Sequence, residues 1–246
     1  MSILLPDVEV LMMASLVIFI AAYVQTILGI GFGLTASPLL ALIDPQLVPV
    51  SALFLSGITA MIGGWNERTK INWTQVSIGV CGRIAGCIIA VVMLALIVGK
   101  SNFELIFGVF IAFAIILSIG GWQLKFNRIN LLLMSTLSGL MATITSVGAP
   151  PMAMIYQAQN PVQARPTLAS FFAFGCLISL VGLMVSNWAS DQAFILAFLL
   201  APAMFAGIFV ARKFPYKMMV HRYRIYLLSI AGIASIILIY NGLRTL

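Results

Sequence analysis

The sequence is short of charge. Of its 246 residues, 13 are Lys or Arg, six are Asp or Glu and one is His, so charged residues make up 8% and hydrophobic residues 62%. Soluble domains contain about 25% charged residues, and so few polar side chains cannot cover a globular surface in water. The composition therefore excludes a soluble, disordered or disulfide-scaffold protein. It predicts a polytopic membrane protein with a single transmembrane domain over residues 1–246.

Side chains for catalysis or metal binding are also scarce. The single histidine, His221, belongs to a basic loop, and no carboxylate lies in the middle of an apolar run. The three cysteines, Cys81, Cys87 and Cys176, form no CxxC pair, and we expect free, packed thiols. Neither GxSxG nor GxxxxGK[ST] is present. We therefore expect no enzyme, no metal and no cofactor.

Apolar runs divide the chain into helices. Seven are long enough to cross about 30 Å of hydrocarbon, namely 10–28, 48–65, 75–98, 103–122, 167–186, 192–210 and 225–243. Two shorter runs, 32–43 and 149–158, follow breaks rich in Gly or Pro, and the run before the second break, 130–146, is marginal. We predict an all-α protein with broken helices at membrane depth, where protein or a water-filled cavity must surround them. The short segments 32–43 and 149–158 either span the membrane or are re-entrant.

The two breaks belong to an internal repeat. Gly31 in the first break and Gly148 in the second are 117 residues apart, and a proline follows each break at the same spacing. The chain therefore divides into two copies, about 8–122 and 129–244, of five hydrophobic segments each. Because five is odd, the copies are expected to be inverted. Paired short, interrupted segments are the best sequence pointer to a transporter binding site, here at the repeat interface.

The charges predict an orientation. If each broken segment returns to the side where it started, the loops 66–74, 123–129, 159–166 and 211–224 share one face and hold ten of the 13 Lys and Arg residues. Short cytoplasmic loops carry this excess. We therefore predict a bacterial inner-membrane protein with both termini at the periplasmic side. The net charge of +7 is then a topology signal that requires no nucleic-acid partner.

One cation, Arg83, lies inside an apolar run. Burying it is costly unless an anion, a carbonyl or water receives it, so Arg83 either serves an anion site, bonds carbonyls or snorkels. Half-helices that begin at mid-depth add N–H groups and positive dipole ends. Arg165 either gates or attracts anions from the cytoplasm, or is an ordinary positive-inside residue. The candidate substrate site comprises Gln25, Thr26, Gly29, Gly31, Gly33, Thr35, Ser37, Arg83, Thr145, Ser146, Gly148, Pro150, Arg165 and Thr167.

Four segments resemble motifs of the TauE/SafE sulfite exporter family of membrane transporters. Residues 25–33 with Pro38-Leu39-Leu40 are similar to the family's first Gly-rich motif, and 66–73 to its basic loop. Gly82-Arg83-Ile84-Ala85-Gly86 resembles its Gly-rich following helix, and Ala164 to Ala169 the corresponding helix start in the second copy. The resemblance implies transport of sulfur-containing anions such as sulfite, sulfoacetate, thiosulfate or related organosulfonates.

The residues and the resemblance together predict a carrier that moves small sulfur-containing anions across the membrane, as an exporter, by alternating access. Its substrate is expected between 25–37 and 143–152. The residues alone indicate a small anion and not sulfur, so a carboxylate carrier and an anion channel remain alternatives. A non-transporting scaffold is the least favoured. The expected partners are the small anion, the lipid bilayer and a coupling ion, H⁺ or Na⁺.

Overall fold

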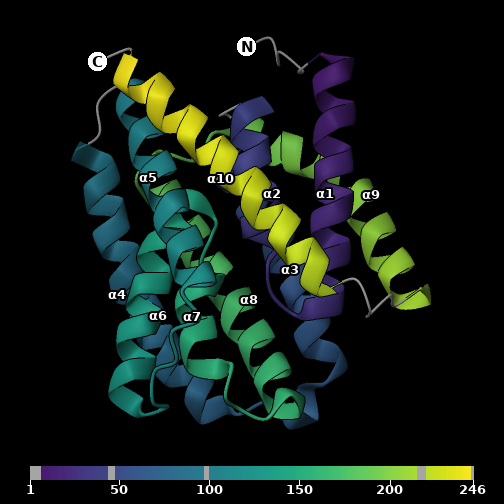
Figure 1. Cartoon of the computed structure of the whole chain (residues 1–246), viewed down its shortest axis with the longest axis vertical. Coiled ribbons are helices and arrows are strands. Elements are labelled where there is room, and N and C mark those ends of the chain that lie inside the picture. Colours follow the sequence, from purple (N-terminus) through teal and green to yellow (C-terminus); the bar gives the residue numbers. More distant parts are fainter. Residues whose placement is uncertain (1–6, 44–47, 97–99, 215–219, 245–246) are drawn as a thin grey trace.

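The computed structural model describes residues 7–43, 48–96, 100–214 and 220–244. This part of the chain is helical and contains no strand (Figure 1). Its helices are α1 (Val8–Leu28), α2 (Phe32–Ile43), α3 (Val50–Asn66), α4 (Trp73–Leu96), α5 (Lys100–Ile119), α6 (Arg128–Thr145), α7 (Ala149–Tyr156), α8 (Pro161–Val185), α9 (Asp191–Lys213) and α10 (Val220–Arg244). Five of the described helices, α1, α4, α5, α8 and α9, are long and apolar enough to cross a membrane. The prediction of an all-α membrane protein is confirmed.

The two breaks have the same backbone form. The residue after α1, Gly29, has φ 79°, and the residue after α6, Ser146, has φ 62°, so both helices are capped by a residue in the left-handed region. A non-glycine residue is uncommon there, and the Ser146 hydroxyl donates a hydrogen bond of 2.9 Å to the Pro49 carbonyl. The next helices begin at Phe32 and Ala149. Both the helix ends and the helix starts thus keep the 117-residue spacing of the sequence repeat.

Helix α8 begins earlier than the sequence predicts. The loop expected at 159–166 ends at Asn160, and α8 starts at Pro161. The Asn160 side chain accepts a hydrogen bond of 3.0 Å from the Val162 N–H, and proline suits the first helical turn because it lacks an N–H. With this start, α8 includes polar residues that precede the apolar run, and the length of an apolar run gives no sign of them. The prediction of a loop there is wrong.

Helices α4 and α6 are in backbone contact along a row of glycines. A Cβ atom on Gly82 would lie 2.5 Å from the Leu132 carbonyl oxygen, and one on Gly86 would collide with the Thr136 carbonyl oxygen. From the other helix, Gly139 faces α4 in the same way. Small residues allow membrane helices to approach this closely. The close packing expected beside Arg83 is therefore present.

The helix contacts have a common pattern. Helix α4 packs on α6, and α1 packs on α9. In the same way, α4 packs on α8, and α3 packs on α9. Two further pairs are α3 with α8 and α5 with α10. Exchanging α1–α5 for α6–α10 converts each of these pairs into another of them or into itself. In Figure 1 the short helix α2 lies in the upper half of the molecule and α7 in the lower half.

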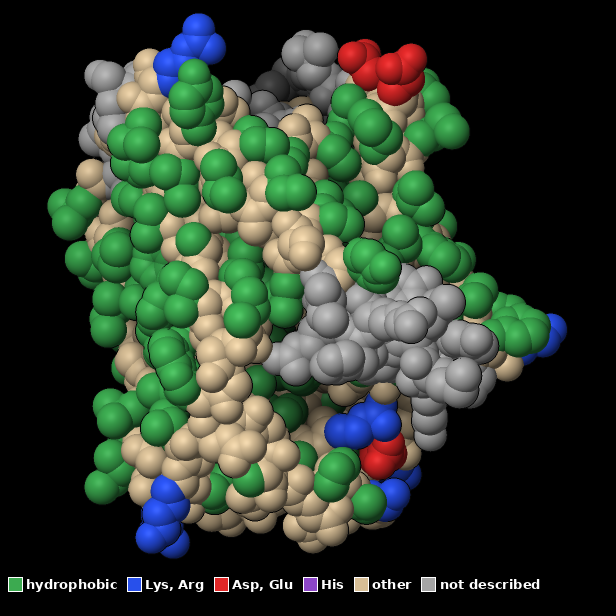
Figure 2. All heavy atoms as spheres, viewed as in Figure 1, with side chains coloured by type: hydrophobic (Ala, Val, Ile, Leu, Met, Phe, Trp, Pro, Cys, Tyr) green, Lys and Arg blue, Asp and Glu red, His purple; other side chains and the backbone are tan. Residues whose placement is uncertain are grey.

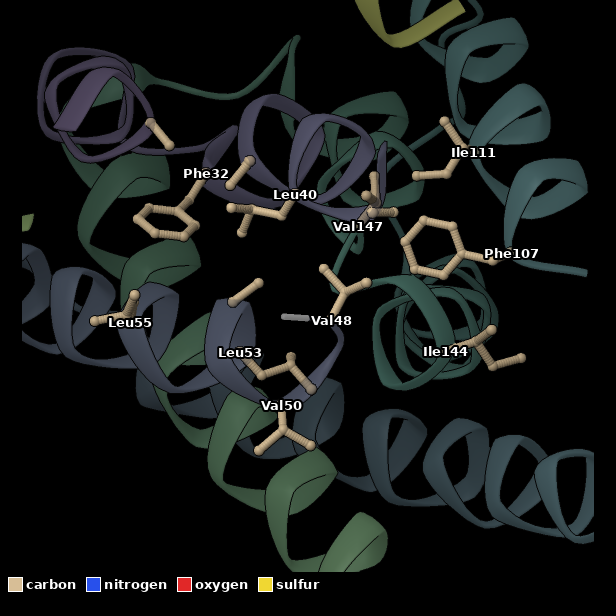
Figure 3. Packing of buried hydrophobic residues seen from close by; sticks show 14 of the residues in the cluster. Phe32, Leu40, Val48, Val50, Leu53, Leu55, Phe107, Ile111, Ile144 and Val147 are labelled. Carbon is tan, nitrogen blue, oxygen red and sulfur yellow. The ribbon is translucent and has the colours of Figure 1, made fainter. Parts of the chain in front are cut away.

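A large apolar cluster includes the short helix α2. Figure 3 shows side chains of this cluster from the second break, the turn before α3, and α2, α3, α5 and α6: Phe32, Leu40, Val48, Val50, Leu53, Leu55, Phe107, Ile111, Ile144 and Val147. The outside is apolar as well, since large side chains such as Ile88 and Phe209 are 59% and 65% exposed. Apolar side chains are spread over the face drawn in Figure 2, whereas charged side chains are few. An outer surface of this kind suits lipid and not water.

Charge divides the two ends of the molecule. On the face in Figure 2, Lys and Arg lie mainly toward the lower end and most of the Asp and Glu atoms at the upper end. Helix α1 begins and α10 ends at the upper end in Figure 1. The side chain of His221 and residues 215–219, which the sequence places on the basic face, lie outside the described residues. Within the described helices, the first and last therefore share one end.

The glycine contact between α4 and α6 predicts a stability effect. Replacing Gly86 by Ala forces these helices apart, which we expect to lower the free energy of unfolding by about 1–3 kcal/mol. Gly63→Ala is the matched control, because a Cβ there meets only the Ala169 Cβ, at 3.8 Å. The thermal unfolding midpoints in detergent measure both effects. Equal midpoints for the two variants would contradict the packing described.

Candidate functional site

Arg83 is the largest fully buried side chain in the described part of the protein. It lies near the middle of the 24-residue α4 and is 0% exposed. Gly79, Gly82 and Gly86 are buried on the same side of α4, because residues three and four apart share one face of a helix. The face that packs against α6 and α8 therefore carries Arg83 into the protein interior, and the side chain does not snorkel to the membrane surface.

Four hydrogen bonds hold the guanidinium. Nε donates to the Gly175 carbonyl at 3.3 Å. Nη1 donates to the Ser138 carbonyl at 3.0 Å and to the Ser138 hydroxyl at 3.2 Å. Nη2 donates to the Ser179 hydroxyl at 3.2 Å. All acceptors lie on α6 and α8, so the second half of the chain holds the charge that the first half supplies.

These acceptors are all neutral. The guanidinium has five N–H donors, and the four bonds engage four of them. The ion pair found among the described residues joins Lys70 to Glu67 at 3.5 Å. Both side chains are exposed, so this pair does not serve as a buried counterion for Arg83. A buried cation without an anion carries a large desolvation penalty. The positive charge of Arg83 is thus dispersed by dipoles and not neutralised.

Two glycines make room for the guanidinium. A Cβ atom on Gly148 would lie 2.9 Å from Nη1, and one on Gly175 would lie 2.8 Å from Nε. The ring of Phe171 covers the group, with its centroid 5.9 Å from Cζ. Gly148 belongs to the second break, which is therefore in direct contact with Arg83. The break and the buried charge form one site.

A small cavity lies between Arg83 and both breaks. Its volume is about 20 Å³, room for about one water molecule. It is lined by residues of both breaks, the starts of α2 and α7, and side chains of α1, α3, α4, α6 and α8: Gln25, Ile30, Gly31, Phe32, Gly33, Leu34, Leu53, Ser56, Arg83, Ala142, Ser146, Gly148, Ala149, Phe172 and Cys176. The first residues of two helices thus lie at the cavity. Helix N-terminal N–H groups and dipoles favour anions.

The two breaks touch each other at this cavity. A Cβ atom on Gly33 would collide with the Ser146 carbonyl oxygen, so only glycine permits this approach of the two backbones. Beside them, the Gln25 amide donates to the Ser56 carbonyl at 3.3 Å. Together with Arg83, these groups present one cation and several neutral donors. This arrangement can bind a small oxyanion.

Two larger hollows adjoin the cavity region. One of about 390 Å³ lies among α1, α2, α5, α7 and α8, and it shares Gly31 and Ala149 with the small cavity. The other, of about 190 Å³, lies among α1, α3, α8 and α9, and it includes Gln25 and Arg212. Arg165 lines both hollows. It therefore stands between the two approaches to the site.

Arg165 also closes the end of the first broken helix. Its Nη2 donates to the Ile27 carbonyl at 2.9 Å and to the Thr26 carbonyl at 3.5 Å. The last carbonyls of a helix lack hydrogen-bond partners and form its negative end. The Arg165 side chain donates hydrogen bonds to these carbonyls and places a positive charge beside the negative end. The side chain is itself exposed. A residue of the second copy thus caps the break of the first copy.

The sequence-predicted site residues fall into three groups. The small cavity is lined by Gln25, Gly31, Gly33, Arg83, Ser146 and Gly148. The hollows are lined by Thr26, Gly29, Thr35, Pro150 and Arg165, in addition to some of the first group. Ser37, Thr145 and Thr167 line none of these spaces.

Each of these three residues is placed elsewhere. The Thr145 hydroxyl bonds to the Met141 carbonyl and accepts from the Val147 N–H, so it stabilises the second break. The Thr167 hydroxyl accepts a hydrogen bond of 3.0 Å from the Asn72 N–H and so fixes the loop before α4. Ser37 is fully buried, and its hydroxyl has no hydrogen-bond partner among the described residues.

Sequence reasoning missed the residues that hold Arg83. Ser138, Gly175 and Ser179 are small residues, which mark close helix contacts in membranes. That signal was available, but it does not tell which helix faces the arginine.

The cysteine expectation needs a correction, since Cys87 and Cys176 are buried but Cys81 is exposed. Cys81 lies beside the glycine row on α4 and not on it. No group of His, Cys, Asp or Glu within the described ranges could hold a metal ion.

These features define a multi-pass helical membrane protein with a buried cation at a cavity between two broken helices. Comparison with protein-family models matches residues 14–238 to the family described as "Sulfite exporter TauE/SafE". The chain belongs to this family, as its motifs predict. The family consists of membrane transporters, so the protein is a transporter and not an enzyme. Comparisons with curated proteins and with solved structures gave no match.

The hydrogen bonds of Arg83 predict the effect of removing one partner. Ser138→Ala deletes a hydroxyl that accepts from Nη1 and donates to the Gly148 carbonyl at 2.7 Å, so we expect about 1–3 kcal/mol of destabilisation. Ser186→Ala is the control, because that hydroxyl bonds only carbonyls at the end of its own helix. Thermal unfolding in detergent compares the two. A larger loss for Ser186→Ala would contradict the role given to Ser138.

Proposed function

We propose that this protein exports small sulfur-containing anions, such as sulfite, sulfoacetate or related organosulfonates, across the cytoplasmic membrane of a bacterium by alternating access. One observation carries the proposal. Arg83 is fully buried, its acceptors are neutral, and it lines a cavity where two broken helices begin. An anion in that cavity would supply the countercharge that the described residues do not place there.

The chemistry of the site favours an oxyanion. The four protein bonds of the Arg83 guanidinium leave one of its five N–H groups for a ligand oxygen, and its charge attracts any anion in the cavity. The starts of α2 and α7 add N–H groups from two directions. Sulfite and sulfonate groups carry several oxygens on one centre and can use both elements at once. Carboxylate and phosphate would satisfy the same donors, and membership of the sulfite exporter family supports the choice of sulfur.

The two halves support an inverted-repeat mechanism. The helix breaks keep one spacing and one backbone form, and the helix pairs are preserved when the halves are exchanged. The copies 8–122 and 129–244 would then rock against each other around the substrate, as in carriers built from inverted repeats. A cavity of about 20 Å³ holds about one water and no sulfite ion. Substrate binding therefore requires the halves to separate, which favours a carrier over a channel.

The hollows indicate the route from the cytoplasm. Both lie beside Arg165, and one also includes Arg212, so cations line the approach to the small cavity. Positive charge raises the local concentration of an anion before it binds. With the basic loops inside, both termini face the periplasm. Arg165 would then release the end of α1 when the first copy moves.

Sulfite flux from proteoliposomes tests this function. A carrier predicts flux that saturates with sulfite concentration and is accelerated by sulfite on the opposite side. Flux that never saturates, with no counter-transport, would assign the protein to the channels. Saturable transport of lactate without transport of any sulfur anion would contradict the substrate class.

Arg83 variants test the site itself. We expect Arg83→Gln to lower sulfite flux at least about tenfold, because the anion loses its buried partner. Arg83→Lys should restore only part of the flux, since lysine keeps the charge but not the planar fork. Arg128→Gln, an equal charge change at an exposed position, is the control. Unchanged, saturable flux in Arg83→Gln would refute the assignment.

A further inference from the structure

An apolar groove runs along the outside of the protein between α3 and α8. Its volume is about 450 Å³, within the range of about 300–1,000 Å³ typical of ligand sites. Small residues allow the helices to meet at its base. A Cβ atom on Gly57 would lie 3.0 Å from the Cys176 Cβ, and one on Gly64 would lie 2.9 Å from the Ser170 hydroxyl. We call it the α3–α8 groove.

Large side chains form the walls of the α3–α8 groove and face outward. Met61 on α3 is 58% exposed, and Phe174 and Leu177 on α8 are 45% and 59% exposed. On a membrane protein such surfaces meet lipid. The groove is therefore open to hydrocarbon along its length, and acyl chains are the apolar molecules that surround it.

One end of the α3–α8 groove has the residues of a membrane–water interface. Trp65 and Trp73 line that end, as tryptophans commonly do at headgroup depth. Arg68 lies there too, with its guanidinium 5.0 Å from the centre of the Trp65 ring. The nearby Lys70 is paired with Glu67, whereas the described residues provide no carboxylate partner for Arg68. An exposed cation thus lies at the mouth of an apolar groove.

We infer that the α3–α8 groove is a binding site for one anionic phospholipid, with an acyl chain along the groove and the phosphate at Arg68. Two observations specify this occupant. The lining is almost wholly apolar below the mouth, which suits a hydrocarbon chain, and the mouth carries a cation between two interfacial tryptophans. Basic pockets between membrane helices on the cytoplasmic side recognise anionic headgroups in this way.

The position of the lipid matters for the rest of the molecule. Helix α3 comes from the first half of the chain and α8 from the second, so the acyl chain would contact both halves. Cys176 lines both the α3–α8 groove and the cavity at Arg83. A single layer of side chains therefore separates the lipid from the small cavity.

Native mass spectrometry of the purified full-length protein tests the headgroup. Phosphatidylglycerol and phosphatidylcholine with identical acyl chains are added in detergent, and the retained lipid is counted. We expect Arg68→Gln to weaken phosphatidylglycerol binding about fivefold and to weaken phosphatidylcholine binding less, because the choline cation offsets the charge of its phosphate. Arg128→Gln, also an exposed arginine made neutral, should change neither. Equal losses in the two arginine variants would show unspecific surface charge and overturn the inference.

A second variant tests the groove. Ala173→Phe places a ring where the acyl chain is expected, and it should abolish retention of both lipids, while Arg68→Gln affects mainly phosphatidylglycerol. Full retention in Ala173→Phe would overturn the inference. So would light scattering that finds a dimer in the original protein and a monomer in Ala173→Phe, because the groove would then hold a second copy of the chain. Because Arg68 is exposed, Arg68→Gln gives its answer without disturbing the packed core.

Discussion

A guanidinium buried among apolar helices must have its N–H groups bonded, and much of this structure serves that requirement. Ser138, Gly175 and Ser179 supply the acceptors, and Gly148 and Gly175 supply the space. Glycines of α4 and α6 bring the two helices close enough for these bonds to form. The described residues place no negative charge beside the guanidinium. The packing thus satisfies four of its five N–H groups and leaves its charge without a counterion, which is the condition that an anionic substrate can satisfy.

The same residues join the halves of the chain. The first half provides Arg83 and the second half provides all its acceptors, while Arg165 of the second half caps the end of α1 in the first. Gly33 and Ser146 bring the two breaks into contact. A movement of one half against the other must therefore change the surroundings of Arg83. In the proposed mechanism, substrate binding and conformational change would be coupled because they involve the same contacts.

The helices and breaks could be predicted because hydrocarbon thickness and Gly/Pro spacing leave a signal along the chain. The predicted run 32–43 coincides with α2, and the second short helix begins at Ala149 as expected. The start of α8 was missed because Asn160 and Pro161 extend a helix through polar residues. Within the site, Arg83 and the glycines of the breaks could be found, since a cation and interrupted helices are rare in apolar runs. Its partners Ser138 and Ser179 could not, because helix pairing depends on three-dimensional packing. Ser37 and Thr145 enter the predicted site because they lie near the breaks in the sequence, and Thr167 because it lies in the segment that resembles the family's helix start.

The central claim is that an oxyanion of sulfur binds at Arg83. The most direct measurement is the thermal shift of the purified protein with sulfite, sulfoacetate, taurine, thiosulfate, sulfate, lactate and phosphate, repeated with Arg83→Gln. A ligand that binds only the folded state raises stability with its concentration. The account predicts stabilisation by sulfite or a sulfonate in the original protein and none in Arg83→Gln. Stabilisation by carboxylates alone, or an equal shift in both proteins, would contradict it.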